Sequence, residues 1–120
     1  MKSLQTQQVP QKLPESVLLF QKIPQPIMTP KLRIEIHVSG RVQGVGYRAF
    51  VLKEASMLML TGWTKHLQNG EVQTIAEGSR EALEELLERL KEGPRYAEVM
   101  HYRVVFLEAT GEFSAFSVRS

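Results

Sequence analysis

The sequence predicts an α+β fold, a two-layer sandwich in which two helices cover one face of an antiparallel sheet. Three observations support this prediction. Two segments repeat apolar residues at helical spacing, several short segments alternate polar and apolar residues as half-buried strands do, and Gly, Pro and Asn-Gly steps separate them. In chain order the segments read strand, helix, strand, strand, helix, strand, and then a short extra strand.

The first strand and the first helix flank a glycine-rich loop. The segment Arg33 to Val38 (RIEIHV) alternates polar and apolar residues, which predicts a half-buried strand. The loop GRVQGVGYR, residues 40–48, follows directly. A helix is then predicted because apolar residues recur on one face of it; they are Tyr47, Phe50, Val51, Ala55 and Leu58.

A hairpin and a second helix follow. Residues 61–67 and 71–77 flank Gln68-Asn69-Gly70, and Asn-Gly predicts a tight turn because both residues tolerate positive φ. Ser79 is suited to cap the second helix. The apolar stripe of that helix consists of Leu83, Leu86, Leu87 and Leu90, and Gly93-Pro94 ends it. The last strands are expected within 99–107 and 113–118, joined around Gly111.

Composition restricts the function classes. The chain has 120 residues, 42% hydrophobic and 23% charged, which is typical of one globular domain. It contains no cysteine, so neither a disulfide nor a thiolate metal site is possible, and the cytoplasm is the expected compartment. No apolar run approaches the ~18–20 residues of a membrane span. There is no Asp, and the three histidines lack metal-ligand spacing, so we expect no metal and no cofactor.

The first thirty residues differ from the rest. Residues 1–30 contain five of the six prolines and none of the eight glycines, which indicates an extended N-terminal extension before a domain at 31–120. The apolar patch from Val17 to Ile23 leaves two alternatives open, a segment docked on the domain and a mobile tether. Residues 1–30 account for the whole net charge of +2. A neutral domain whose second helix has an acidic side disfavours a nucleic-acid partner.

The glycine loop has the features of an anion site. It leaves a strand and enters a helix, so its backbone N–H groups and the positive end of the helix dipole can converge on one point. Glycines allow an anion to approach the backbone closely, and Arg48 adds a planar cation suited to phosphate or carboxylate. The alternative is a plain tight turn followed by a surface arginine. The loop matches neither GxxxxGK[ST] nor GxGxxG.

These residues resemble the acylphosphatase family. The resemblance rests on GRVQGVGYR, on Leu60-Thr61-Gly62-Trp63 and on Asn69-Gly70-Glu71-Val72, and it runs from about Arg33 to the C-terminus. It implies a ferredoxin-like fold and hydrolysis of acyl phosphates, which are carboxyl-phosphate anhydrides, to carboxylate and phosphate without metal or covalent intermediate. The phosphate site it implies consists of Gln43, Gly44, Val45, Gly46, Tyr47 and Arg48, with Arg48 as the catalytic cation. Inorganic phosphate or sulfate should compete there, and a monomer is expected.

Two positions depart from the family pattern. The family's second catalytic residue is an Asn that positions water, and an ungapped match places His66 there. Asn69 belongs to the turn and cannot replace it. We therefore expect a hydrolase weakened by His66, with a non-catalytic phosphate- or partner-binding module as the alternative. Relatives usually have Gly where this chain has Met59, so either the turn is altered or Met57 and Met59 are packing residues.

Overall fold

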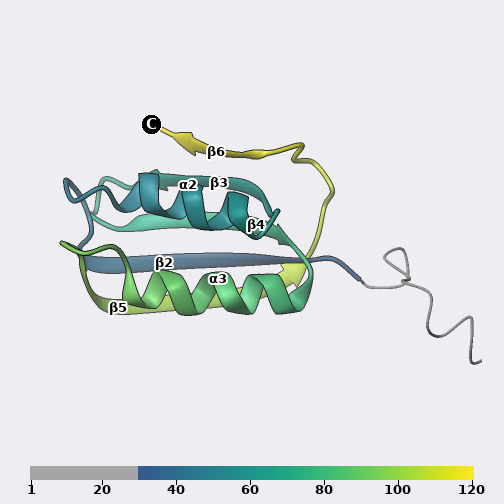
Figure 1. The fold of residues 1–120 in the computed structure, drawn as a ribbon, viewed down its shortest axis with the longest axis horizontal. Coiled ribbons are helices and arrows are strands. Elements are labelled where there is room, and N and C mark those ends of the chain that lie inside the picture. Colours follow the sequence, from purple (N-terminus) through teal and green to yellow (C-terminus); the bar gives the residue numbers. More distant parts are fainter. Residues whose placement is uncertain (1–29) are drawn as a thin grey trace, which may run out of the picture. The chain divides into compact units, whose positions relative to one another are not determined.

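The computed structural model describes residues 30–120, and residues 31–120 form one compact unit. The predicted extension at residues 1–30 and the patch from Val17 to Ile23 lie almost wholly outside the described residues, so both remain predictions. The elements are β2 (Leu32–Arg41), α2 (Tyr47–Met57), β3 (Thr61–His66), β4 (Val72–Gly78), α3 (Arg80–Glu92), β5 (Glu98–Glu108) and β6 (Phe116–Arg119) (Figure 1). In this part of the chain no helix combines the length and the apolar character of a membrane span.

The strands form a single five-stranded sheet in the order β5-β2-β4-β3-β6. The neighbours β5–β2, β2–β4 and β4–β3 are antiparallel, which confirms the expected arrangement of the first four strands. The extra strand β6 differs because it pairs with β3 in parallel, so the sheet is mixed. The reason is the path of the chain, which crosses after β5 to the opposite edge of the sheet and there runs in the direction of β3 (Figure 1).

The core lies between the sheet and the two helices, as the alternation predicts. In β2 the side chains of Ile34, Ile36 and Val38 are buried, whereas the residues between them face the other side of the sheet. The predicted stripes of the helices pack against this surface. Their buried members are Tyr47, Val51 and Ala55 of α2 and Leu83, Leu86 and Leu90 of α3.

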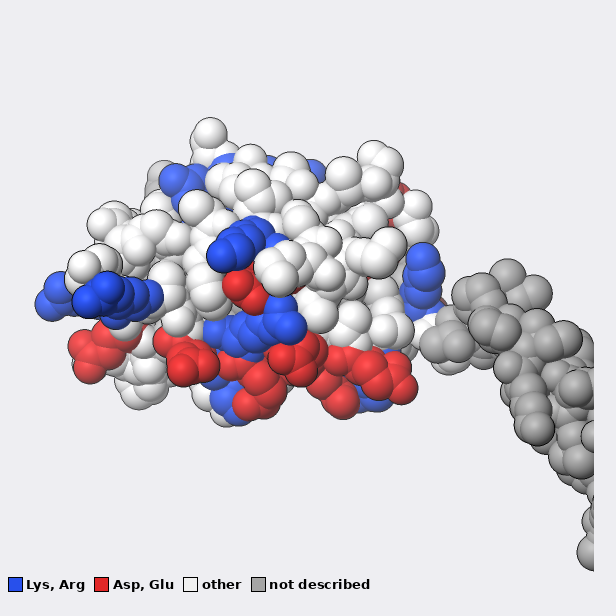
Figure 2. All heavy atoms as spheres, viewed as in Figure 1, with Lys and Arg blue, Asp and Glu red and all other residues white. Residues whose placement is uncertain are grey.

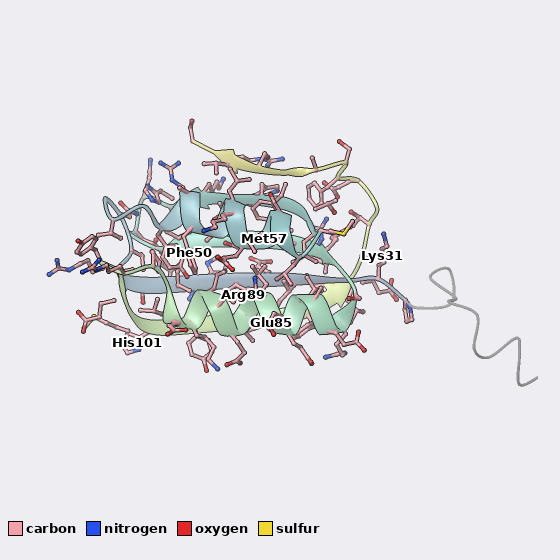
Figure 3. The ribbon with its side chains drawn as sticks, in the orientation of Figure 1. Lys31, Phe50, Met57, Glu85, Arg89 and His101 are labelled. Atoms are coloured by element: carbon pink, nitrogen blue, oxygen red, sulfur yellow. The ribbon has the colours of Figure 1, made fainter. Side chains whose placement is uncertain are left out.

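Polar contacts at α3 fix where this helix begins and how it lies beside α2. Ser79 is the N-cap, as predicted, and its Oγ accepts a hydrogen bond from the backbone N–H of Ala82 at 3.2 Å. Arg89 donates to Glu54 of α2 at 2.7 Å. It also donates to Glu85 of its own helix at 3.1 Å, and Figure 3 labels these two residues on α3. Carboxylates form a band along the outer surface of α3, with Lys and Arg side chains among and beside them (Figure 2), and three ion pairs within the helix join the two kinds of charge.

The turn after α2 places a methionine in a backbone conformation that favours glycine. Met59 has φ 59°, and the N–H of Leu60 donates to the carbonyl of Ala55 at 2.9 Å, which is the hydrogen-bond pattern of a helix end with a left-handed residue. The alternative that Met57 and Met59 are packing residues is wrong, because the two residues are 64% and 88% exposed. The left-handed backbone of Met59 keeps the turn that a glycine would make and directs the side chain into solvent.

Candidate active site

The glycine loop connects the end of β2 to the start of α2. Its ends are anchored in the core by the buried side chains of Val42 and Tyr47. Gly44 and Gly46 have φ 75° and 77°, and a Cβ at either position would meet nothing within 4 Å. Glycine is therefore needed for the backbone conformation and not for space. Gly40 is different, since a Cβ there would lie 2.2 Å from the carbonyl oxygen of Glu98 on β5.

The first turn of α2 offers unpaired donors. Within residues 30–120 no acceptor pairs with the backbone N–H of Tyr47, Arg48 or Ala49, and the first intrahelical bond runs from Phe50 to Gly46 at 3.0 Å. No acidic residue lies in this turn. The positive end of the helix dipole is thus not neutralised by a neighbouring side chain of the described chain, which favours an anionic ligand.

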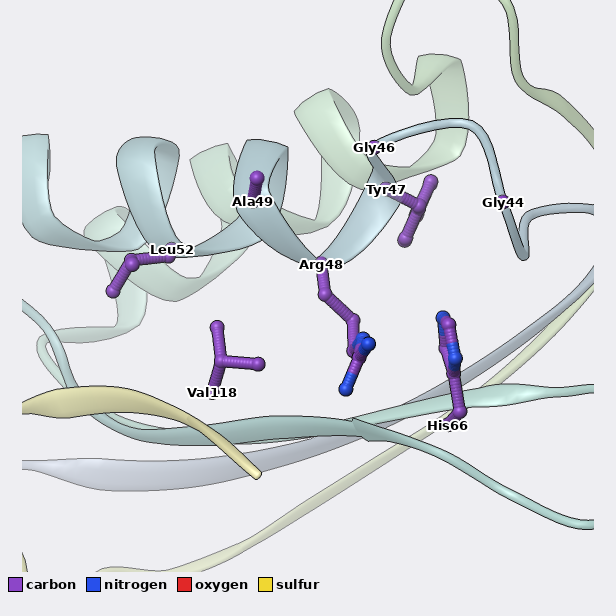
Figure 4. Close-up of a pocket in the computed structure, with 8 residues that line it drawn as sticks. All are labelled: Gly44, Gly46, Tyr47, Arg48, Ala49, Leu52, His66 and Val118. Carbon is purple, nitrogen blue, oxygen red and sulfur yellow. The ribbon is translucent and has the colours of Figure 1, made fainter. Parts of the chain in front are cut away.

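A pocket of about 400 Å³ lies beside this turn. Its walls come from the loop, from α2 and from the strands β3 and β6 (Figure 4). The residues that line it are Gly44, Gly46, Tyr47, Arg48, Ala49, Leu52, His66 and Val118. The structure therefore brings the two predicted catalytic side chains, Arg48 and His66, to one cavity.

Arg48 is held at the pocket by the last strand. Its Nη1 donates to the backbone carbonyl of Arg119 at 2.9 Å. In the described part of the chain no carboxylate forms an ion pair with it, although most other arginines there have such a partner. A guanidinium has five N–H donors, so the remaining ones can bind a ligand.

His66 faces the same cavity from β3. Thr64 is buried beneath α2, whereas Trp63 lies on the opposite face of the sheet, stacked by Arg119 at 4.6 Å. The alternation of the strand then places His66 on the side of Thr64, and Figure 4 shows its ring pointing from β3 toward the loop. Partial burial and, secondly, the charge of Arg48 lower the pKa of His66 below its ordinary value, which favours the neutral imidazole.

Other predicted members of the site have side chains that lie elsewhere. Gln43 and Val45 do not line the pocket: the Gln43 amide donates to the carbonyl of Leu67 at 3.3 Å, and Val45 packs against the core. The Tyr47 ring is buried and its Oη donates to the carbonyl of Leu90 at 2.6 Å, so burial raises the pKa of this phenol. We therefore expect these three residues to contact an anion at the loop through their backbone N–H groups.

Sequence reasoning missed the apolar wall formed by Ala49, Leu52 and Val118. One signal was present for Leu52, which follows Arg48 by four residues and so lies on the same helix face. No local signal indicates Val118, because its place depends on the pairing of β6 with β3. Among residues 30–120 no group of three or more side chains is arranged to hold a metal ion; the prediction of a metal-free site remains a prediction.

Comparison with known proteins agrees with this geometry. Residues 34–118 match the family model for acylphosphatase. The acylphosphatase of Syntrophotalea carbinolica is 43% identical over 88 residues, which cover 73% of this chain and 96% of that protein. The crystal structure of acylphosphatase from Bacillus subtilis has a TM-score of 0.72 at 37% identity and covers 74% of this chain and 99% of its own. The structure of an acylphosphatase from Coxiella burnetii has a TM-score of 0.71 at 40% identity and covers 75% of this chain and 94% of its own. The chain belongs to the acylphosphatase family, which confirms both the resemblance and the ferredoxin-like fold.

Proposed function

We propose that the protein hydrolyses acyl phosphates to a carboxylate and phosphate. The observation that supports this most directly is the meeting of unpaired helix N–H groups with an arginine that has no carboxylate partner in the described chain. Both kinds of donor suit the equatorial oxygens of a phosphoryl group. The relatives and solved structures named acylphosphatase supply the substrate class.

The reaction needs only positioned donors and a positioned water. The water oxygen bonds to phosphorus while the bond from phosphorus to the acyl oxygen breaks. The electron pair leaves with the carboxylate, and the protons of the water remain on phosphate. The loop N–H groups and Arg48 stabilise the charge that spreads over the phosphoryl oxygens. We assign His66 to the attacking water, and we expect no metal, cofactor or nucleic-acid partner in this reaction.

His66 is expected to make the enzyme slow. An Asn amide offers water an acceptor and a donor on neighbouring atoms, whereas a neutral imidazole offers one of each on nitrogens that point in different directions. We infer an activity about 10–1,000-fold below that of an Asn-bearing relative, the range of positioning and proton-transfer contributions. The same substitution favours the alternative of a phosphate- or partner-binding module without turnover.

The variant Arg48→Ala tests the proposal. With acetyl phosphate as substrate, kcat/KM should fall by roughly 30- to 1,000-fold, which corresponds to about 2–4 kcal/mol of transition-state stabilisation. The inhibition constant of inorganic phosphate should rise in parallel, and sulfate should compete in the parent protein. Arg80→Ala is the matched control, because Arg80 begins α3, is 55% exposed and does not line the pocket.

The outcomes separate the two functions. Unchanged kinetics of Arg48→Ala would exclude this pocket as the active site. A parent protein that binds phosphate in an Arg48-dependent manner but turns over no acyl phosphate would be a binding module. As further parts of the proposal, we expect the enzyme to be a cytoplasmic monomer.

A further inference from the structure

The pocket is polar at one end and apolar at the other. Figure 4 shows Arg48 near the middle, with His66 and Gly44 on one side and Leu52 and Val118 on the other. The unpaired N–H groups belong to the first turn of α2, at the polar end. Among the described residues that line the cavity, Arg48 has the one permanent charge.

The apolar wall is built by a helix and the last strand. Leu52 lies one turn after Arg48 on α2, and the exposed Ala49 lies between them in the chain. Val118 of β6 pairs in register with Thr64 of β3, whose buried side chain faces α2. Paired residues of parallel strands point to the same side of a sheet, so Val118 faces α2 as well. Leu52 and Val118 thus approach each other across one end of the cavity.

This arrangement sets the direction of a bound acyl phosphate. When the phosphoryl oxygens bind the loop N–H groups and Arg48, the loop and His66 close the polar end. The acyl group then extends along the other end of the pocket. We propose that Ala49, Leu52 and Val118 form an acyl subsite that selects acyl phosphates with an uncharged, apolar acyl group. This inference rests on the proposed function for its substrate class.

The chemistry of the wall disfavours a second anion. A carboxylate or phosphate on the acyl group would lie beside Leu52 and Val118 and would find no cation among the residues lining that end. Val118 is 41% exposed, so the wall is open to solvent and longer acyl chains fit. Because the wall is partly open to solvent, we expect only about a tenfold preference for a longer apolar acyl group over a short one. This is the lower end of the discrimination that a methylene-sized contact in an apolar pocket achieves.

Phosphonates test the subsite without turnover. In NMR titrations the parent protein should bind butylphosphonate about tenfold more tightly than methylphosphonate, because only the longer chain reaches the wall. Leu52→Ala should reduce this ratio to about two, mainly by weakening butylphosphonate. Met57→Ala is the matched control on the same helix: Met57 is 64% exposed, lies outside the pocket, and its variant should keep the parental ratio. Val118→Ser, on the strand side of the wall, should reduce the same affinity ratio to about two. This variant provides the test if Leu52→Ala does not fold.

Turnover separates this inference from the proposed function. The parent should hydrolyse butanoyl phosphate with a higher kcat/KM than acetyl phosphate, and succinyl phosphate, which adds a carboxylate, should be poorer than butanoyl phosphate. Equal affinity for both phosphonates, or a ratio that neither wall variant changes, would overturn the subsite even if acyl phosphates are hydrolysed. The opposite result, a chain-length preference in binding without any hydrolysis, would overturn the proposed function and leave the subsite standing.

Discussion

Arg33 and Arg48 both lie beside loops that contain glycine, and within residues 30–120 only Arg33 of these two has a carboxylate partner. Arg33 donates to Glu77 at 2.8 Å and to Glu112 at 3.0 Å. Glu77 also accepts hydrogen bonds from the backbone N–H groups of Thr110 and Gly111 at 2.8 and 3.0 Å. Arg48 lies beside similar backbone donors, but within residues 30–120 no carboxylate occupies that position. One cluster binds an anion of the protein itself, and the other presents the same kinds of donor to a pocket.

The cluster of Arg33, Glu77, Thr110 and Gly111 shows how such donors change the pKa of a carboxylate. Burial alone raises the pKa of Glu77, whose side chain is only 4% exposed. Hydrogen bonds from Thr110, Arg33 and Gly111 outweigh burial, so the pKa is lowered and the carboxylate stays ionised. An arginine together with loop N–H groups can therefore compensate for the desolvation of an anion. At Arg33 this stabilises the fold, whereas at Arg48 it is available for a ligand.

After Arg48→Ala, the largest effect is expected from the other polar side chain of the pocket, in the variant His66→Asn. Turnover of acetyl phosphate should rise by about 10–1,000-fold, because the amide offers the water a donor and an acceptor side by side. The parent should lose activity as the pH falls through the lowered pKa of His66, below the ordinary 6.5, since only the neutral imidazole accepts a proton. The Asn variant should lack this acidic limb. A parent and a variant with equal rates and equal pH profiles would show that His66 does not hold the water.

Arg33→Ala should produce the opposite phenotype to Arg48→Ala. It removes the cation beside a buried carboxylate, so the free energy of unfolding should fall by about 2–3 kcal/mol while kcat/KM of the folded protein is retained. Urea denaturation and a turnover assay on the same sample measure the two quantities. Arg103→Ala is the control, because its pair with Glu71 involves a guanidinium that is 62% exposed and should contribute less than about 1 kcal/mol. A loss of activity without a loss of stability at Arg33 would contradict the comparison.

The pH dependence of the free energy of unfolding should reveal how much the charge of Glu77 stabilises the fold. Its pKa is lower in the folded than in the unfolded chain, so its contribution is complete above the unfolded value of about 4.5 and is lost as the pH falls through the folded value. The parent should therefore exceed Glu77→Gln in stability at pH 7, and the difference should shrink toward pH 3. Glu84→Gln, at a side chain 55% exposed, should show little difference at either pH. A gap between parent and Glu77→Gln that stays constant with pH would mean that the charge of Glu77 is not what stabilises the cluster.

The smallest effect concerns a left-handed turn that lies at neither arginine cluster. Gly46 and Gly111, at the two arginine clusters, have φ 77° and 74°, whereas Met59 has φ 59° with a side chain in solvent. Met59→Gly should raise the free energy of unfolding by about 1 kcal/mol, because it removes the steric cost of a side chain in this conformation. Met57→Gly, two residues earlier and within the helix, should lower it by about 1 kcal/mol. Thermal melts measure both, and a destabilised Met59→Gly would show that the Met59 side chain has a packing role.

Local patterns in the sequence were sufficient to predict the helices and strands and the part of the site formed by the glycine loop and Arg48. The alternation at Ile34, Ile36 and Val38, the helix stripes, the Ser79 cap and the loop leading to Arg48 each depend on neighbours within a few residues. Such interactions are visible in the sequence because strand and helix periods are fixed by backbone geometry. The order of these elements was sufficient to predict the two-layer α+β sandwich, and the family resemblance added the pairing of Arg48 with His66.

Only the tertiary structure decided the contacts between distant segments. Arg33 meets Glu77 across 44 residues, and the apolar wall of the pocket requires Val118 to reach α2 by way of a parallel strand. These contacts depend on the path by which the chain crosses from β5 to the far edge of the sheet, and no local spacing encodes that path. The same holds for the difference between the two arginines. Each arginine belongs to an amphipathic element, so their immediate sequences do not tell them apart. The fold places Glu77 beside Arg33, which makes that cluster structural. It places no carboxylate of the described chain beside Arg48, which leaves that cluster open to a ligand.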